Sequence, residues 1–229
     1  PEAVSRGALV IDDGSAFRMD SDVPLVVPEV NGADVEWHSG IISIPNCTTT
    51  PLVMALAALR QATPITRVTV ATYQAVTGTG AAALRELEDQ ASAYAAGEEL
   101  RASVYPHQIA MNVLPHVDDF FDDGYTGEEH KMINETRKIM HLPGLPVSST
   151  CVRVPVPTSH SEAVHVEFAR PVEPEQARQL LSEFDGIALV DAPRSNQYPR
   201  PHTSAGRDEV FVGRVRKDLS HPNGLVLWI

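Results

Sequence analysis

The stretch Ser43–Leu59 reads S-I-P-N-C-T-T-T-P-L-V-M-A-L-A-A-L and joins a short apolar strand to an apolar helix. The strand is expected at Ile41–Ile44. Pro51 suits the first turn of a helix that runs to about Gln61, with the threonines before it as candidate caps. Cys47 then lies at the amino end of this helix, where free N–H groups and the helix dipole favour a thiolate. Such a polar surround also suits the oxyanion of a thioester intermediate. The stretch therefore predicts a reactive cysteine, and the alternative is a cysteine that pairs or fills core space.

Outward from this stretch, strand and helix patterns alternate, which indicates an α/β protein. The second half holds more strands, which predicts a larger mixed sheet with helices on one face and the other face left for a subunit partner. The expected strands are Ala8–Asp12, Leu25–Val30, Ile41–Ile44, Val68–Thr72, Thr150–Val156, Ala163–Ala169, Ile187–Asp191, Val210–Val215 and Leu225–Ile229. The expected helices, besides the one after Cys47, are Ala81–Ala95, Glu173–Phe184 and one from a Thr126/Glu129 capping box to about Met140.

Composition limits the partners that the 229-residue chain can have. It carries 18 basic and 30 acidic residues, a formal net charge of −12, and no block of Lys or Arg. We therefore expect no nucleic-acid partner, and an anionic metabolite would have to be held by individually placed cations. No apolar run approaches the roughly 20 residues that span a bilayer, so no membrane partner is expected. Two cysteines, Cys47 and Cys151, fit a reducing compartment, and Cys151 is expected to fill core space.

Three polar residues at strand ends are candidates for catalysis or substrate binding. His160, in S-H-S between two expected strands, suits the protonation and deprotonation of a substrate oxygen. Arg153 lies in an otherwise apolar strand, where a guanidinium needs a carboxylate or phosphate; an internal salt bridge is equally open. Gln74 ends a strand and can orient a reacting group, or it can stabilise the turn that follows.

A second group of charged residues is weaker evidence on spacing alone. Glu128 and Lys131 are three residues apart at a helix start, so they share a face and usually form a solvated salt bridge. Arg18 is a cation in the loop G-S-A-F-R. The run G-T-G-A-A-A at 78–83 fits a dinucleotide fingerprint, but no acidic strand end follows about 20 residues later, so we reject it as the main cofactor site. Thr77 and Gly78 remain candidates for contact with the nicotinamide end of a cofactor.

Taken together, several motifs resemble aspartate-β-semialdehyde dehydrogenases. The motifs are P-N-C-T-T at 45–49, T-Y-Q-A-V-T-G at 72–78, E-E-H-K at 128–131 and T-C-V-R-V-P-V-P-T-S-H at 150–160, with V-P-L-V-V-P-E-V-N at 23–31 and F-V-G-R-V-R-K-D at 211–218. The resemblance covers nearly the whole chain. It implies a cytoplasmic, NADPH-dependent reductive dephosphorylation of β-aspartyl phosphate to aspartate semialdehyde, without a metal, on the route to lysine, diaminopimelate, threonine and methionine.

The resemblance also implies a role for each candidate residue. Cys47 would attack the acyl phosphate, His160 would be the acid–base catalyst, and Gln74 would orient the intermediate. Arg153 would clamp the substrate carboxylate, and Glu128 would lie near its ammonium group. Arg18 and Lys131 would hold the phosphate, and Asn46 would line the substrate site. A homodimer, or a tetramer of dimers, would form through the sheet of the second half.

Departures from the family pattern concern the ends of the chain. We expect residues 1–46 to be the last part of an NADP-binding Rossmann domain and 47–229 a catalytic and dimerisation domain of the glyceraldehyde-3-phosphate-dehydrogenase type, incomplete at its end. Most of the cofactor domain would then be missing, and this chain alone would bind NADPH poorly. Two alternatives are a related cysteine-dependent acyl-phosphate reductase of the same superfamily and a non-catalytic paralogue. The second requires a lost nucleophile, whereas Cys47 is present.

Overall fold

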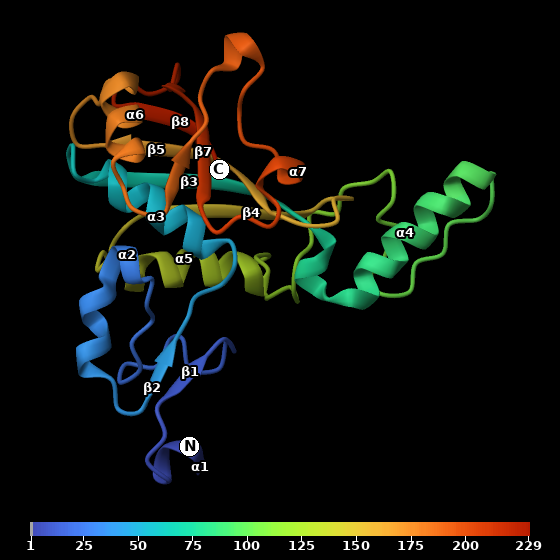
Figure 1. Cartoon of the computed structure of the whole chain (residues 1–229), viewed down its shortest axis with the longest axis horizontal. Coiled ribbons are helices and arrows are strands. Elements are labelled where there is room, and N and C mark those ends of the chain that lie inside the picture. Colours follow the sequence, from blue (N-terminus) through green and yellow to red (C-terminus); the bar gives the residue numbers. More distant parts are fainter. Residues whose placement is uncertain (1) are drawn as a thin grey trace.

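A six-stranded mixed sheet forms the centre of the molecule in the computed structural model, which describes residues 2–229 (Figure 1). Its order is β4-β3-β5-β8-β7-β6, with β3/β4 and β6/β7 parallel and the other neighbours antiparallel. The mixed sheet predicted for the second half is therefore confirmed. Its strands are β3 (Ile65–Gln74), β4 (Val147–Arg153), β5 (Ser161–Phe168), β6 (Ile187–Leu189), β7 (Val210–Lys217) and β8 (Gly224–Trp228).

Three helices cover one face of this sheet. They are α3 (Thr49–Leu59), α5 (Gly127–Ile139) and α6 (Pro174–Ser182). From Leu52 to Leu59 every residue of α3 is buried, so this helix is apolar on all sides and forms the middle of the main core. The predicted capping box starts α5: Glu129 N–H donates to Thr126 Oγ1, and Thr126 N–H donates to Glu129 Oε2 at 2.8 Å. These contacts fix the start of α5, which carries Glu128 and Lys131.

Among the described residues 2–229, no helix covers the opposite face of the sheet. Along β3, Val68, Val70 and Thr72 are buried on the helix side, whereas Ala71 is half-buried and Tyr73 exposed on the other side. The ring of Tyr73 lies 5.2 Å from that of Trp228 on β8, measured between centroids. The prediction that helices cover one face and leave the other open is confirmed.

The amino-terminal part forms a separate two-stranded parallel sheet beyond α5 (Figure 1). One expectation here was wrong, because Leu25–Val30 is not a strand: Leu25 makes a single bridge to Ser43, and a helix begins at Pro28. Proline suits a first helical turn, and Asn31 ties it back by accepting from Val27 N–H and donating to Leu25 O, both at 2.9 Å. The elements are α1 (Glu2–Ser5), β1 (Val10–Asp12), α2 (Pro28–Asn31), η1 (Gly32–Trp37) and β2 (Ile41–Ser43).

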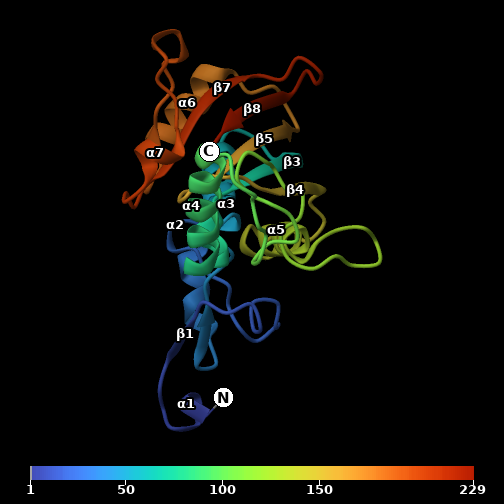
Figure 2. The same ribbon diagram turned by 90° about the vertical axis from the view of Figure 1, so that its right-hand side faces the viewer.

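An arm built on η2 (Val76–Thr79) and α4 (Ala81–Ala96) projects from the carboxyl end of β3 (Figures 1 and 2). It has a small core of its own around Ala83, Leu87 and Ile109. The long loop at 191–208 contains only η3 (Pro193–Ser195) and α7 (Pro201–Ser204). Within residues 2–229, no helix is both long and apolar enough to cross a membrane.

Candidate active site

Cys47 lies in the short connection between β2 and α3 and is exposed. The preceding residue, Asn46, organises this turn: its Oδ1 accepts from Thr48 N–H at 2.9 Å and from Thr48 Oγ1 at 2.6 Å, and lies 3.9 Å from the Cys47 sulfur. The threonines were expected to cap α3, but Thr48 at the N-cap position makes no side-chain cap because its hydroxyl is used by Asn46. The backbone N–H groups of Cys47 and Thr48 are the ones that favour the thiolate, because Thr50 N–H already donates to Asn46 O at 3.1 Å and Pro51 has no N–H.

The thiol itself is not activated as the sequence suggested. Although Cys47 is exposed as a residue, protein surrounds most of the space around the sulfur, and this burial raises the pKa of the thiol to about 11. The carboxylate of Glu128 raises this pKa further, while backbone N–H groups and Arg153 act in the opposite direction. The expectation of a thiolate in the free chain was therefore wrong, because burial outweighs the helix terminus.

We expect iodoacetamide to label Cys47 more slowly than free cysteine at pH 7, because a pKa of about 11 leaves only about one thiol in 10⁴ ionised. The labelling rate should rise about tenfold per pH unit toward this pKa, since the thiolate is the reactive form. Intact mass measured over a pH series checks this. A rate that has already reached its plateau at pH 8 would contradict the raised pKa.

A hydrogen-bonded network on Glu128 joins three of the predicted site residues. The Glu128 carboxylate accepts from Asn46 Nδ2 at 3.0 Å and from Gln74 Nε2 at 2.8 Å, and lies 3.4 Å from Lys131 Nζ. The Gln74 amide is oriented from its other side by Thr72, whose hydroxyl donates to Oε1 at 3.0 Å. Glu128 is 5 % exposed, and these donors compensate its buried charge. Gln74 therefore orients the carboxylate of Glu128, and its role is not limited to stabilising the turn that follows β3.

Two cations, Arg18 and Lys131, lie next to this network. Arg18 pairs with Glu135 at 3.1 Å in a buried contact, and the second oxygen of Glu135 accepts from Asn46 N–H at 2.8 Å. Lys131 also pairs with Asp118 at 2.7 Å. Although burial alone would lower it, the pKa of Lys131 is raised by the carboxylates of Asp118 and Glu128. Arg18 and Lys131 line one cavity of about 310 Å³.

Arg153 and His160 meet at the peptide of Ala75, the residue after Gln74. Ala75 N–H donates to His160 Nδ1 at 2.9 Å, and Ala75 O accepts from Arg153 Nη1 at 2.6 Å. Among residues 2–229 Arg153 forms no ion pair with a carboxylate, so the alternative of an internal salt bridge is wrong. Burial, and secondly Arg153, lower the pKa of His160 to about 4. His160 is thus neutral at pH 7, and its proton is on Nε2, because Nδ1 accepts the Ala75 N–H.

Cys47 lies near both the Glu128 network and the pair formed by Arg153 and His160. Cys47 and His160 line the same cavity of about 300 Å³, and both feel the charges of Glu128 and Arg153. The structure therefore brings together, around one thiol, the predicted residues from β2–α3, β3, α5, β4 and the start of β5. Cys151, in contrast, is fully buried beside Met132 and fills core space as predicted.

The predicted cofactor residues Thr77 and Gly78 lie in η2, next to this group. A Cβ on Gly78 would stand 3.0 Å from Arg153 Nη1 and 3.2 Å from His160 Cε1. We expect Gly78→Ala to displace both side chains and to lower kcat/KM by about tenfold, with little change in thermal stability. Steady-state kinetics and thermal unfolding measure the two effects. Gly144→Ala is the matched control, because a Cβ at Gly144 meets no atom within 4 Å; equal kinetics of the two variants would contradict the prediction.

Sequence reasoning missed several residues that hold the site. Glu135 lies seven residues after Glu128 on α5, and this spacing could have indicated that both carboxylates share a face. Asp118 stands in a run of acidic residues, D-D-F-F-D-D, where nothing distinguishes it. Glu162 lines the cavity of Cys47, is fully buried, and has a pKa well above its ordinary value because of that burial.

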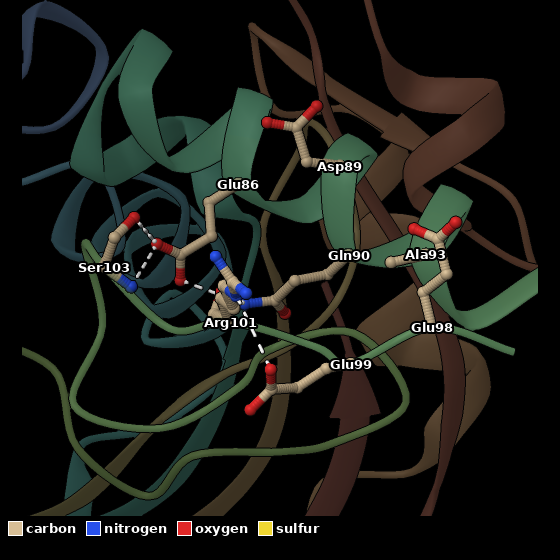
Figure 3. A pocket seen from close by; sticks show the side chains of 8 residues that line it. All are labelled: Glu86, Asp89, Gln90, Ala93, Glu98, Glu99, Arg101 and Ser103. Carbon is tan, nitrogen blue, oxygen red and sulfur yellow. Dashed lines mark hydrogen bonds and ion pairs between the residues drawn. The ribbon is translucent and has the colours of Figure 1, made fainter. Parts of the chain in front are cut away.

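A different cavity, of about 450 Å³, lies between α4 and the loop that follows it and contains none of the predicted site residues (Figure 3). One oxygen of Glu86 accepts from the backbone N–H and the hydroxyl of Ser103, at 2.9 and 2.7 Å. Gln90 donates to Arg101 O, and Arg101 faces Glu99. These polar groups hold the loop against α4, which is a structural role.

Profiles of two known domains match the chain. The one described as "Semialdehyde dehydrogenase, dimerisation domain" matches residues 56–229, and "Semialdehyde dehydrogenase, NAD binding domain" matches residues 1–38. A cysteine at a helix start and a neutral histidine share one cavity, and a buried arginine meets the same histidine at Ala75. Together with the matched profiles, this fold and site define a semialdehyde dehydrogenase.

Relatives specify the class further. Proteins named aspartate-semialdehyde dehydrogenase from Aquifex aeolicus and Bacillus subtilis are each 50 % identical over all of this chain, which spans 68 % of their length. The chain belongs to the aspartate-semialdehyde dehydrogenase family, a group of nicotinamide-dependent oxidoreductases of amino-acid biosynthesis. Crystal structures of aspartate semialdehyde dehydrogenase II from Vibrio cholerae, one of them complexed with ASA, align with a TM-score of 0.96 at 43 % identity, over 100 % of this chain and 68 % of theirs. A Candida albicans relative with NADP aligns with a TM-score of 0.73 at 27 % identity, over 99 % of this chain and 66 % of that one.

Proposed function

We propose that the site catalyses the NADPH-dependent reductive dephosphorylation of β-aspartyl phosphate, with Cys47 as the nucleophile. One observation carries this proposal: side chains from five separate segments converge on the thiol of Cys47. They include Arg153, which has no carboxylate partner among residues 2–229, and Glu128, whose carboxylate accepts from amide and ammonium donors. An amino acid carries the complementary pair of charges. The arrangement therefore suits an amino-acid substrate whose side-chain carbonyl reaches Cys47.

The chemistry balances as two transfers. The Cys47 sulfur forms a C–S bond to the acyl carbon, the C–O bond to phosphate breaks, and the thiol proton leaves with the phosphate. When bound, a reduced nicotinamide cofactor would supply the hydride that the thioester carbon accepts. The resulting alkoxide expels the sulfur of Cys47 to give the aldehyde, and a solvent proton restores the thiol. A high thiol pKa favours this last protonation.

His160 acts on the substrate oxygen in this scheme. Its Nδ1 is occupied by Ala75 N–H, so the neutral ring presents Nε2–H. Full loss of that proton would leave an imidazolate, which is unfavourable. We therefore propose that His160 acts only as a donor and not as a base. Its Nε2–H would donate a hydrogen bond to the substrate oxygen that becomes negative during both transfers. The backbone N–H groups of Cys47 and Thr48 are further donors near the sulfur, and Gln74 orients Glu128.

In this proposal, different charged residues bind different groups of the substrate. Arg153 binds the α-carboxylate, and Glu128, held by Asn46 and Gln74, faces the ammonium group. Lys131 and Arg18 hold the phosphate, because both line a single cavity next to the Glu128 network. Their present partners, Asp118 and Glu135, are the groups with which the phosphate would compete.

The nicotinamide end of the cofactor is assigned to Thr77 and Gly78. The absence of a Cβ at Gly78 brings the η2 backbone against Arg153 and His160, so a flat ring docked on this turn would adjoin the catalytic groups. NADP rather than NAD is proposed from the family resemblance. Cytoplasmic localisation is proposed because both cysteines are free.

A second copy of the chain is proposed to cover the open face of the sheet, where Tyr73 and Trp228 lie. The description of residues 56–229 as a dimerisation domain supports this contact. We also propose 46/47 as the domain boundary, which falls between the two matched profiles.

Single-turnover chemistry tests the proposed function. Mixing the chain with β-aspartyl phosphate, without cofactor, is expected to add one aspartyl group to Cys47, as seen by intact mass and peptide mapping. Addition of NADPH should then release aspartate semialdehyde, slowly if this chain binds the cofactor poorly. Turnover of glyceraldehyde 3-phosphate with none of aspartate semialdehyde would instead indicate a related acyl-phosphate reductase.

A further inference from the structure

The guanidinium of Arg153 is covered by the ring of Tyr105, which belongs to the loop after α4. The Arg153 Cζ atom lies 6.0 Å from the centroid of this ring, and Arg153 is 5 % exposed. A guanidinium over an aromatic face is attracted by the ring quadrupole, and more strongly when water is excluded. A ring at this distance restricts where the guanidinium can move.

The hydrogen bonds of Arg153 leave one edge of the guanidinium for a ligand. Nη1 donates to Ala75 O at 2.6 Å, whereas Nε is buried and has no partner among residues 2–229. A buried donor without a partner is costly, so a ligand that accepts from Nε is favoured. A carboxylate accepts two parallel N–H bonds from one guanidinium edge, and here that edge is the one between Nε and Nη2.

Tyr105 is itself held in place by the arm. Its hydroxyl lies 3.0 Å from Thr79 Oγ1 and 3.4 Å from Val76 O, both in η2. Its ring packs against the small core of the arm. The arm therefore holds Tyr105, and Tyr105 lies over the guanidinium of Arg153.

We propose that Tyr105 is a positioning residue that selects substrates with an α-carboxylate, by holding the Nε–Nη2 edge of Arg153 toward the Cys47 site. This inference rests on the proposed role of Arg153 in binding the carboxylate. Tyr105 touches neither the substrate nor the reacting atoms in this proposal. Its effect should therefore appear in the binding of the carboxylate and not in the rate of acyl transfer.

Two substitutions separate the ring from the hydroxyl. In single-turnover acylation of Cys47, followed by intact mass, Tyr105→Leu should raise the half-saturating concentration of β-aspartyl phosphate about tenfold, while the maximal rate stays within about twofold. Tyr105→Phe keeps the ring and should stay within about twofold of the wild type in both parameters. The comparison compound is 3-aminopropanoyl phosphate, which lacks only the α-carboxylate. All variants should leave its half-saturating concentration unchanged.

Tyr94→Leu is the matched control, because Tyr94 lies on α4 in the same arm and is 55 % exposed. Tyr105→Met replaces Tyr105→Leu if thermal unfolding shows that the latter is not folded. An equal rise for both acyl phosphates, or no rise for β-aspartyl phosphate, overturns the proposal. Arg153→Leu distinguishes a failure of the proposed role of Arg153 from a failure of the role inferred for Tyr105. If Arg153→Leu keeps the preference for β-aspartyl phosphate over 3-aminopropanoyl phosphate, the proposed role of Arg153 fails. If Arg153→Leu abolishes this preference while Tyr105→Leu keeps it, only the role of Tyr105 fails.

Discussion

A Cys47→Ser variant is expected to fold like the wild type and to form no thioester, so that kcat falls by about 10⁴-fold or more. A serine hydroxyl at this position would be a much poorer nucleophile and leaving group than the sulfur. The local structure should persist, because Asn46 and Thr48 form the turn through their own atoms and Cys47 contributes only a contact of 3.9 Å. Steady-state kinetics and circular dichroism measure the two effects.

The other cysteine provides the control. Cys151 is fully buried in β4, with its sulfur 3.8 Å from that of Met132. Cys151→Ala should cost about 1 kcal/mol of stability through lost packing and leave kcat unchanged. If Cys47→Ser retained activity while Cys151→Ala lost it without unfolding, the nucleophile would be assigned wrongly.

The fold could be predicted well where periodicity was strong. The helices at 49–59, 81–96 and 127–139 and the mixed sheet of the second half follow from apolar spacing and from the Thr126 capping box. The strand predicted at Leu25–Val30 was wrong, because a short buried apolar run has the same composition in a strand and in an irregular segment. There Pro28 and the side chain of Asn31 determined the backbone. Strand order could not be predicted at all, because β5 and β8 pair over some 60 residues of sequence.

The site was predictable as a set of residues but not as an electrostatic environment. Motif spacing indicated Cys47, Gln74, Arg153 and His160, and the structure brings them together. The raised pKa of Cys47 depends on the desolvation of the sulfur and on Glu128, which is 81 positions away in sequence. A helix terminus can be recognised locally, whereas the burial that outweighs it is set by the tertiary structure. The same holds for Ala75, whose backbone selects the tautomer of His160.

The tautomer of His160 leads to the second large effect. If Nε2–H is a hydrogen bond donor to the oxyanion, His160→Gln should lose about 10²-fold in kcat, because the longer amide can place an N–H near the position of Nε2. His160→Asn and His160→Ala should lose about 10⁴-fold, since neither reaches that position. Acylation bursts and steady-state rates of the three variants, measured at one pH, test this order.

The pH profile distinguishes this role from that of a protonated histidine. The pKa of His160 is about 4, so the ring is neutral throughout the range from pH 5 to 9, and its titration should leave no limb there. An imidazolium acid would instead lose activity as the pH rises through its pKa. A limb between pH 6 and 7 in the wild type that disappears in His160→Gln would contradict a neutral donor. Absence of such a limb, together with the order Gln above Asn and Ala, would mean that the Ala75 N–H group determines how this histidine works, by occupying Nδ1 and leaving Nε2 to face the substrate.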